Sequence, residues 1–318
     1  PETRKYWAYP DTGVWDPERN VQEFCAALPT WRDHGVLGFT INFQGGGALY
    51  APEIYDHFDN NGFTPRGDVK PAYAERIAQV LARADELGMV AIVGLFYCAH
   101  LRKMEGEKAI WRAGHEALSF LESTGRRNLL IEVANEADVC VRRSGYDIFQ
   151  PERVHEMIAH YRRAHPAFLY SCSLGGTNPE TGAGMPSPSL IEASDYVLLH
   201  GNGAREARLA AAIEAVQSHP AYRAHPKPLM INEDSPGLPN LEAAWRRGVS
   251  WGYFDQGYGG AAAWAGDAYV DYRTQPRERC YEDLSGFQTP PVNWTINTDL
   301  KRAFFGRVAE ITGVTPTV

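Results

Sequence analysis

Residues 89–97 read MVAIVGLFY, a run of apolar residues interrupted only by one glycine. A run of this kind is typical of a strand that is covered on both faces. The preceding residues 71–87 carry apolar side chains at a helical spacing, begin with Pro71 and are followed by Gly88. Proline at the start and glycine at the end are typical helix boundaries. The stretch therefore predicts a helix that leads into a buried, parallel strand.

The same alternation of amphipathic stretches and apolar runs continues along the chain. Further strands are expected at 6–9, 36–43, 128–134, 168–173, 196–200 and 228–232, and finally at 250–254 or 260–264. Further helices are expected at 21–34, 108–123, 151–165, 189–193, 205–218, 241–248 and 299–311. About eight strand–helix units predict an α/β protein with one (β/α)8 TIM barrel domain that spans residues 1–318.

A doubly wound parallel sheet is the main alternative fold, since it also alternates strands and helices. Its usual nucleotide-binding signals are missing, because no GxGxxG follows the first expected strand and no GxxxxGK[ST] occurs. The barrel leaves two long segments, 44–70 and 265–297, outside the strand–helix units. Long loops commonly bind substrates, so we expect both to line the binding site. Candidate sugar-stacking side chains in and beside these loops are Tyr50, Tyr55, Trp264, Tyr269 and Tyr272.

The composition limits the range of partners. The chain has 31 Lys and Arg residues against 39 Asp and Glu residues, which gives a net charge of −8. An acidic chain without a basic run is a poor candidate for binding nucleic acid or an anionic membrane. No segment reaches the ~18 apolar residues of a membrane span. We therefore expect a soluble protein, exported or cytoplasmic, and the sequence leaves its oligomeric state open. The five cysteines form no CxxC pair, and we expect no cofactor.

An Asn-Glu pair ends two of the expected strands, as Asn135-Glu136 and as Asn232-Glu233. Active sites of (β/α)8 barrels lie at the ends of the strands. Glycoside hydrolysis needs two carboxyl groups, one to protonate the leaving oxygen and one to attack the anomeric carbon. We therefore predict Glu136 and Glu233 as a catalytic pair. Further candidates, for substrate binding, are Asn42, Gln44, His100, Asn135, His200, Asn202 and Trp264.

The segment IEVANE at 131–136 resembles the strand-four signature of the clan A retaining glycoside hydrolases. These proteins are (β/α)8 barrels and include the family 5 cellulases and mannanases. The resemblance implies that Glu136 is the acid/base, that Glu233 is the nucleophile and that Asn135 contacts the 2-hydroxyl of the sugar. It also implies that His100 and His200 lie near the cleft. Trp264 resembles the tryptophan that lies under the −1 sugar.

Two positions depart from the pattern of this clan. Asn42-Phe43-Gln44 stands where many members carry an arginine, and His200-Gly201-Asn202 replaces a His-x-Tyr sequence. The chain therefore resembles a divergent member of this clan. Its sugar substrate should not be assigned from that of any named family. The resemblance implies hydrolysis of an oligo- or polysaccharide by double displacement on two glutamates.

Two other functions remain open from the residues alone. Glu136, Glu233, Asp234, His100 and His200 offer ligands for a divalent cation, as in barrel sugar isomerases or metal-dependent hydrolases. No close ligand spacing supports such a site, so we predict no bound metal. The third possibility is a barrel that binds carbohydrate without turnover, and the presence of both glutamates argues against it.

Overall fold

The computed structural model describes residues 8–46, 59–255, 286–287 and 292–317. Several of the expectations above therefore lie outside the described residues. They concern half of the strand at 6–9, whose described residues Ala8 and Tyr9 are not in a strand, the strand alternative at 260–264, most of the loop at 265–297, and the aromatic residues Tyr50, Tyr55, Trp264, Tyr269 and Tyr272.

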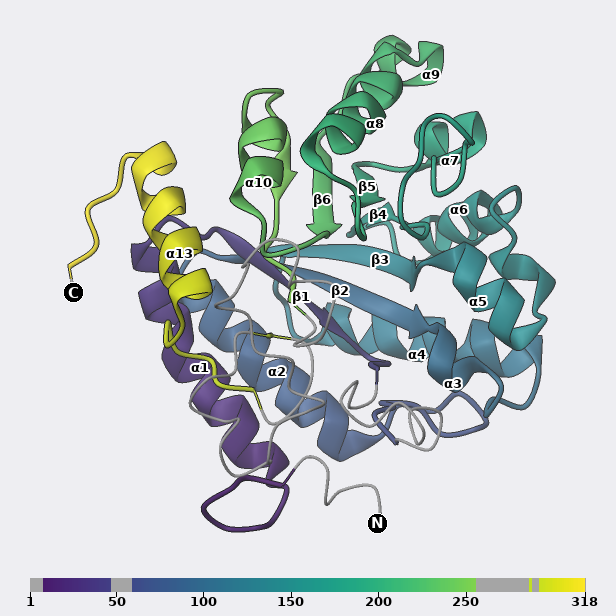
Figure 1. Cartoon of the computed structure of the whole chain (residues 1–318). Helices are drawn as coiled ribbons and strands as arrows, with labels where there is room; N and C mark the ends of the chain where they lie inside the picture. Colours follow the sequence, from purple (N-terminus) through teal and green to yellow (C-terminus); the bar gives the residue numbers. More distant parts are fainter. Residues whose placement is uncertain (1–7, 47–58, 256–285, 288–291, 318) are drawn as a thin grey trace.

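Seven strands form two sheets among the described residues (Figure 1), in the orders β1–β2–β3–β4 and β5–β6–β7. Every neighbouring pair within these sheets is parallel. The strands are β1 (Gly38–Asn42), β2 (Val90–Tyr97), β3 (Leu129–Asn135), β4 (Leu169–Ser171), β5 (Val197–His200), β6 (Leu229–Glu233) and β7 (Ser250–Trp251). Each lies where an apolar run predicts a strand, which confirms this part of the prediction.

Helices surround the strands on the outside (Figure 1). The helices of eight or more residues are α1 (Pro17–Asp33), α2 (Pro71–Glu86), α4 (Glu107–Ser123), α5 (Ala137–Ser144), α6 (Val154–Ala164), α8 (Glu206–Ser218), α10 (Leu238–Trp245) and α13 (Asp299–Thr312). The shorter ones are α3 (Cys98–Leu101), the 3-10 helix η3 (Asp147–Phe149), α7 (Pro188–Ala193) and α9 (Pro220–Ala224). The sequence pattern does not predict α3, α5, η3 or α9, because they are too short for an apolar spacing to repeat. No described helix is long and apolar enough to cross a membrane.

Both sheets face one shared interior. Ile92 of β2 packs with Leu198 of β5 and Met230 of β6 in a single hydrophobic cluster. The backbone N–H of Asp195 donates to the carbonyl of Tyr170 at 2.8 Å, so the chain lies beside β4 directly before β5 begins. The sheets therefore curve around one core with helices outside, which is the (β/α)8 barrel expected from the sequence.

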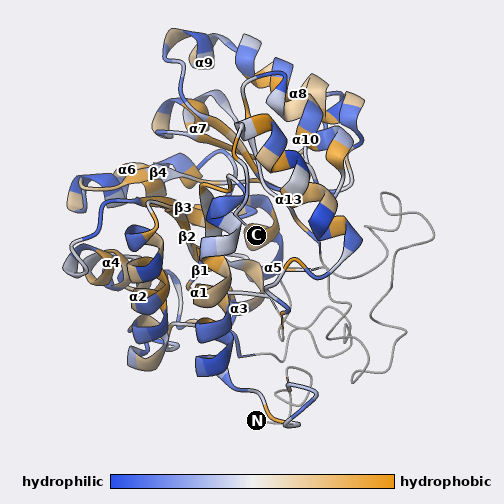
Figure 2. Cartoon of the chain, turned by 90° about the vertical axis from the view of Figure 1, so that its left-hand side faces the viewer, coloured by the Kyte–Doolittle hydropathy of each residue, from blue (hydrophilic) through white to orange (hydrophobic). Residues whose placement is uncertain are grey.

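The C-terminal helix α13 packs beside α1 and covers the barrel between its last and first described strands. Trp31 of α1 lies against Phe305 of α13, with ring centroids 6.0 Å apart. Trp251 of β7 and Phe39 of β1 pack against the same cluster. Figure 2 shows the strands mainly in hydrophobic colours, whereas helices such as α2 carry both colours. The apolar faces of the helices thus pack on the barrel while their polar faces meet water.

We expect Phe305→Ala to lower the free energy of unfolding by about 3–5 kcal/mol, because it leaves a cavity among packed aromatic rings. Phe305 is only 1% exposed. Arg302→Ala on the same helix is the matched control, since that side chain is 56% exposed and its ion pair contributes less than about 1 kcal/mol. Chemical denaturation followed by circular dichroism measures both. Equal losses for the two variants would contradict the packing role of Phe305.

Candidate active site

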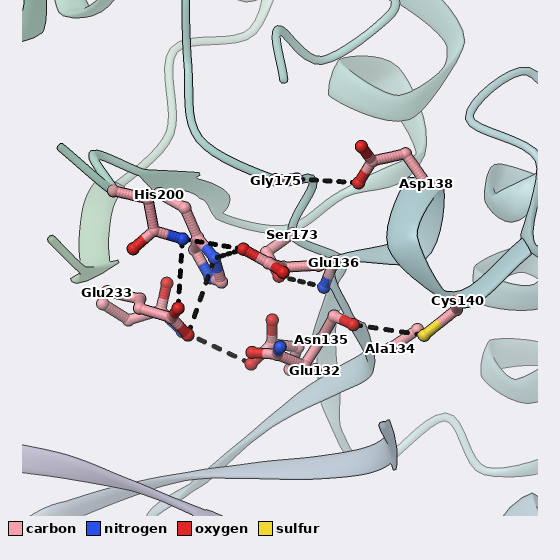
Figure 3. Close-up of polar contacts among 12 residues, drawn as sticks. Glu132, Ala134, Asn135, Glu136, Asp138, Cys140, Ser173, Gly175, His200 and Glu233 are labelled. Atoms are coloured by element: carbon pink, nitrogen blue, oxygen red, sulfur yellow. Dashed lines mark hydrogen bonds and ion pairs between the residues drawn. The ribbon is translucent and has the colours of Figure 1, made fainter. Parts of the chain in front are cut away.

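Glu136 directly follows β3 in a left-handed backbone conformation, with φ 51° and ψ 67°. This conformation is uncommon for a residue with a Cβ and costs about 1–3 kcal/mol where the surroundings impose it. Ser173, shortly after β4, stabilises the turn. Its Oγ accepts from the Glu136 N–H at 2.9 Å, and its carbonyl accepts from the Ala137 N–H at 3.0 Å. The turn ends β3, starts α5 and directs the Glu136 carboxylate toward Glu233 (Figure 3).

Glu233 reaches the same site through a β-bulge. The register of β5 on β6 shifts, so that His200 opposes Glu233 and Asn232 becomes the extra residue. Regular alternation would direct Asn232 and Glu233 to opposite faces of the strand. With the bulge, Asn232 Nδ2 donates to Glu132 Oε2 at 3.3 Å in the interior, and Glu233 still reaches His200. The bulge therefore re-aims Glu233 into the barrel mouth.

Two side chains at and after the end of β5 join the glutamates (Figure 3). Asn202 donates through Nδ2 to Glu136 Oε1 at 2.7 Å and to Glu233 Oε1 at 3.0 Å. His200 Nδ1 lies 3.1 Å from Glu136 Oε1 and 3.7 Å from Glu233 Oε2. One oxygen of each glutamate and one His200 nitrogen all lie within 4.8 Å of one another. Four residues that the sequence names separately thus form one cluster.

His200 is completely buried beside the two carboxylates. Burial lowers the pKa of its imidazole, but the charges of Glu233 and Glu136 and the Glu136 hydrogen bond together raise that pKa to about 9. An imidazolium is therefore the stable form near neutral pH, and its Nδ1–H donates to Glu136 Oε1. Its positive charge compensates for part of the repulsion between the two glutamates.

We expect the stabilisation of the fold by His200 to depend on pH. Its pKa of about 9 in the folded chain lies above the ~6.5 of an unfolded histidine. The contribution is fully present below pH ~6.5 and is lost as the pH rises through about 9. The unfolding free energies of wild type and His200→Gln, compared from roughly pH 6 to pH 10, should converge with rising pH. A difference that is constant across this range would show that His200 is neutral when folded.

A third glutamate lies in the barrel interior close to this cluster. Glu132 is completely buried on β3, and burial raises the pKa of its carboxyl group to about 7. Burial also raises the pKa of Glu233, while the charge of His200 acts in the opposite direction. Glu132 is absent from the residues predicted from the sequence. A charged residue inside a strand expected to be buried on both faces is the signal that points to it.

Asp234 holds the loops around the site in place. Its Oδ2 accepts from Trp251 Nε1 at 2.7 Å and from Asn240 Nδ2 at 2.7 Å. Gly201 lies so close that a Cβ there would be 1.8 Å from Asp234 Oδ1. Asp234 therefore supports the segment that carries His200, and its Oδ2 is engaged by protein donors. Trp251 and Asn240 are also absent from the residues predicted from the sequence.

The side chains of two further predicted residues, His100 and Gln44, form hydrogen bonds within the protein. His100 Nε2 lies 2.9 Å from the carbonyl of Gly45. Burial lowers the pKa of His100 to about 4, so its imidazole is neutral and donates to this carbonyl. Gln44 is completely buried, and its side chain accepts from the Tyr97 N–H at 3.0 Å and donates to Asn61 at 3.2 Å. These contacts fasten the loop after β1 to the end of β2.

Asn42 and Asn135 lie at the ends of β1 and β3. Asn42 packs against Gly94, where a Cβ would lie 1.9 Å from Asn42 Oδ1. Asn135 is 7% exposed, and its carbonyl accepts from Cys140 Sγ at 3.2 Å. In the part of the chain that the structure describes, no hydrogen bond joins these two side chains, Gln44 or His100 to either glutamate. Trp264, the remaining predicted residue, lies outside that part.

Comparison with protein-family models gives no match, and comparison with curated proteins gives none either. Solved structures do match over nearly the whole chain. The hyperthermostable endo-1,4-β-D-mannanase from Thermotoga petrophila RKU-1 aligns with a TM-score of 0.54 and 14% identity, covering 93% of this chain and 96% of the mannanase. The glycoside hydrolase family 5 mannosidase from Rhizomucor miehei aligns with a TM-score of 0.53 and 12% identity, covering 98% and 92%.

A third match is the broad-specificity endoglucanase of glycoside hydrolase family 5 from Clostridium longisporum. It aligns with a TM-score of 0.52 and 10% identity, covering 92% of this chain and 86% of the endoglucanase. Sequence identities this low support an inference about the fold. The chain therefore has the (β/α)8 fold that these glycoside hydrolases share.

Proposed function

We propose that this chain is a glycoside hydrolase that cleaves a β-linked oligo- or polysaccharide with retention of the anomeric configuration. The spacing of Glu136 and Glu233 carries the proposal, because their nearest carboxylate oxygens lie within 4.8 Å. Retaining enzymes hold the two carboxyl groups ~5–5.5 Å apart, whereas inverting enzymes need ~6.5–9.5 Å to admit a water molecule. The fold shared with mannanases and an endoglucanase supports the same assignment.

The proposed reaction has two steps. Glu233 attacks the anomeric carbon while Glu136 donates a proton to the leaving oxygen, which forms a glycosyl-enzyme ester and releases an alcohol. Glu136 then removes a proton from water, and the resulting nucleophile displaces Glu233. His200 and Asn202 donate hydrogen bonds that stabilise negative charge on the two carboxylates. Asn135 remains our proposed contact with a sugar hydroxyl.

A divalent cation bound by Glu136, His200 and Glu233 is the second candidate, because three potential ligand atoms lie within 4.8 Å of one another. Metal-binding histidines must be neutral. The neighbouring glutamates instead raise the pKa of His200 to about 9. Asn202 Nδ2 also directs a donor, rather than a ligand atom, toward both carboxylates. The Asn202 donor between the two carboxylates favours hydrolysis without a metal ion.

Turnover of a panel of aryl β-glycosides and β-linked polysaccharides, with and without EDTA, tests the proposal. We expect hydrolysis of at least one member at a rate that EDTA leaves unchanged. Full inhibition by EDTA that a divalent cation reverses would favour the metal-dependent alternative. Binding of a sugar without turnover of any member would favour a carbohydrate-binding barrel.

A further inference from the structure

Asn202 offers one nitrogen to both glutamates. Its Nδ2 lies 2.7 Å from Glu136 Oε1 and 3.0 Å from Glu233 Oε1. An amide nitrogen carries two hydrogens, so it can donate one to each oxygen. The reverse orientation of the amide would bring its oxygen against two carboxylate oxygens, which is repulsive. Unlike a histidine, an amide also keeps these donors at every pH in the physiological range.

Asn202 has an unusual backbone conformation that places its side chain between the two glutamates. Its φ is 32°, and Glu136 is the only other non-glycine residue in the described ranges with a positive φ. Asparagine tolerates this conformation better than most residues. Gly176 makes room for it, since a Cβ there would lie 3.0 Å from Asn202 Cβ, and the neighbouring Gly201 makes room for Asp234, which a Cβ there would overlap. Asn202 and Glu136 both have strained backbones, and their side chains contact each other. Strained residues of this kind cluster at functional sites.

The contacts of Glu136 also distinguish its two oxygens. Oε1 accepts from Asn202 Nδ2 at 2.7 Å, and His200 Nδ1 lies 3.1 Å away. An oxygen that accepts two hydrogen bonds has no lone pair directed at a third proton donor. When Glu136 carries its acid proton, that proton therefore belongs on Oε2. The pair of donors thus leaves Oε2 as the oxygen that can carry this proton.

We propose that Asn202 is a positioning residue that holds Glu136 and Glu233 at the separation needed for retention and directs the acid proton of Glu136 to Oε2. This inference rests on the proposed glycosidase function and deepens it. Without Asn202, the two carboxylates would repel each other with only His200 to bridge them. Either oxygen of Glu136 could then carry the proton.

The test compares Asn202→Gly with wild type on a glycoside that wild type hydrolyses. Glycine accepts the backbone conformation at this position, so the variant should keep the fold. We expect kcat to fall on the order of 10²-fold with little change in KM, since one preorganised donor is lost. The pH profile of kcat/KM should shift to higher pH, because Glu233 loses a hydrogen bond that favours its charged form.

The matched control is Asn128→Gly at the opposite end of β3, where Asn128 Nδ2 donates to the carbonyl of Met89 at 2.7 Å. It should leave the pH profile unchanged. Asn202→Asp retains the shape and the tolerance for this backbone but replaces the donor with a third carboxylate, so it should lower kcat further. Wild-type kcat and an unshifted profile in Asn202→Gly would overturn the proposal.

A measurement made without substrate tests this inference independently of the proposed function. Carbon-13 NMR titration of labelled glutamate carboxyl groups, assigned with Glu136→Gln and Glu233→Gln, follows both groups directly. We expect Asn202→Gly to raise the pH at which Glu233 titrates, because the Asn202 hydrogen bond acts against the effect of burial on this pKa. If that shift occurs while the wild type hydrolyses no glycoside, the proposed function is wrong, but the effect of Asn202 on Glu233 is confirmed. Unchanged titrations would contradict the role of Asn202 even if wild type is active.

Discussion

Glu233→Ala is expected to lower kcat/KM on the order of 10⁵-fold on any glycoside that the wild type hydrolyses, equivalent to ~7 kcal/mol of transition-state stabilisation. Without this carboxylate no covalent intermediate forms, and water in its place is a far weaker nucleophile. The fold should persist, because alanine also relieves the burial of a charged group beside Glu132. Steady-state kinetics with a chromogenic aryl glycoside measure the loss.

Added azide provides a second measurement on the same variant. In the proposed mechanism, the cavity left by the Glu233 carboxylate faces the anomeric carbon, so azide should attack there and restore turnover. One displacement instead of two gives a glycosyl azide of inverted configuration. Glu75→Ala, an exposed glutamate on α2, is the control and should keep wild-type activity. Retention of more than about one tenth of wild-type activity in Glu233→Ala would contradict its role as nucleophile.

Glu136→Ala is expected to affect substrates according to their leaving groups. A poor leaving group needs the proton of Glu136, so its release should slow by ~10²–10⁴-fold. A dinitrophenolate leaves without a proton, and the glycosyl-enzyme should form from it at nearly the wild-type rate. Its hydrolysis then slows because the base that activates water is missing. Rapid-mixing measurements should therefore show a burst of dinitrophenolate followed by slow turnover.

The comparison of the two leaving groups decides the role of Glu136. A loss that is equal for alkyl and dinitrophenyl glycosides would contradict its assignment as the acid/base. Unchanged rates on both would show that Glu136 is a structural turn residue, a reading that its left-handed backbone also permits. Ser173→Ala, which removes the hydroxyl that accepts from the Glu136 N–H, tests the turn separately and should affect both substrates alike.

The sequence predicts much of the barrel because strand and helix periodicity is a local property. The run at 89–97 is apolar enough to identify β2 without any tertiary information. Short helices are not predicted by the periodicity of apolar residues. The eight-residue helix α5 begins directly after Glu136 and carries two arginines in its last turn, and it has too few turns for an apolar spacing to repeat. Its start depends on the turn that Ser173 holds.

The two glutamates are predictable because each ends an apolar strand, but the contacts between them are not. The bulge at Asn232 depends on the pairing of β6 with β5. The bridging position of Asn202 depends on Gly176 and Gly201, which allow a close approach of separate loops. The charge of His200 likewise depends on its distances to two carboxylates. These features arise from tertiary packing, and periodicity along the chain carries no signal for them.

The anomeric form of the first product tests the account most directly. Proton NMR, recorded during the first minutes of hydrolysis of a β-glycoside by the wild-type protein, distinguishes the α from the β anomer before mutarotation mixes them. Glu136 and Glu233, with one oxygen of each within 4.8 Å of the other, predict that the β anomer appears first, as double displacement requires. Initial appearance of the α anomer would show single displacement by water and would contradict the role of Glu233 as nucleophile.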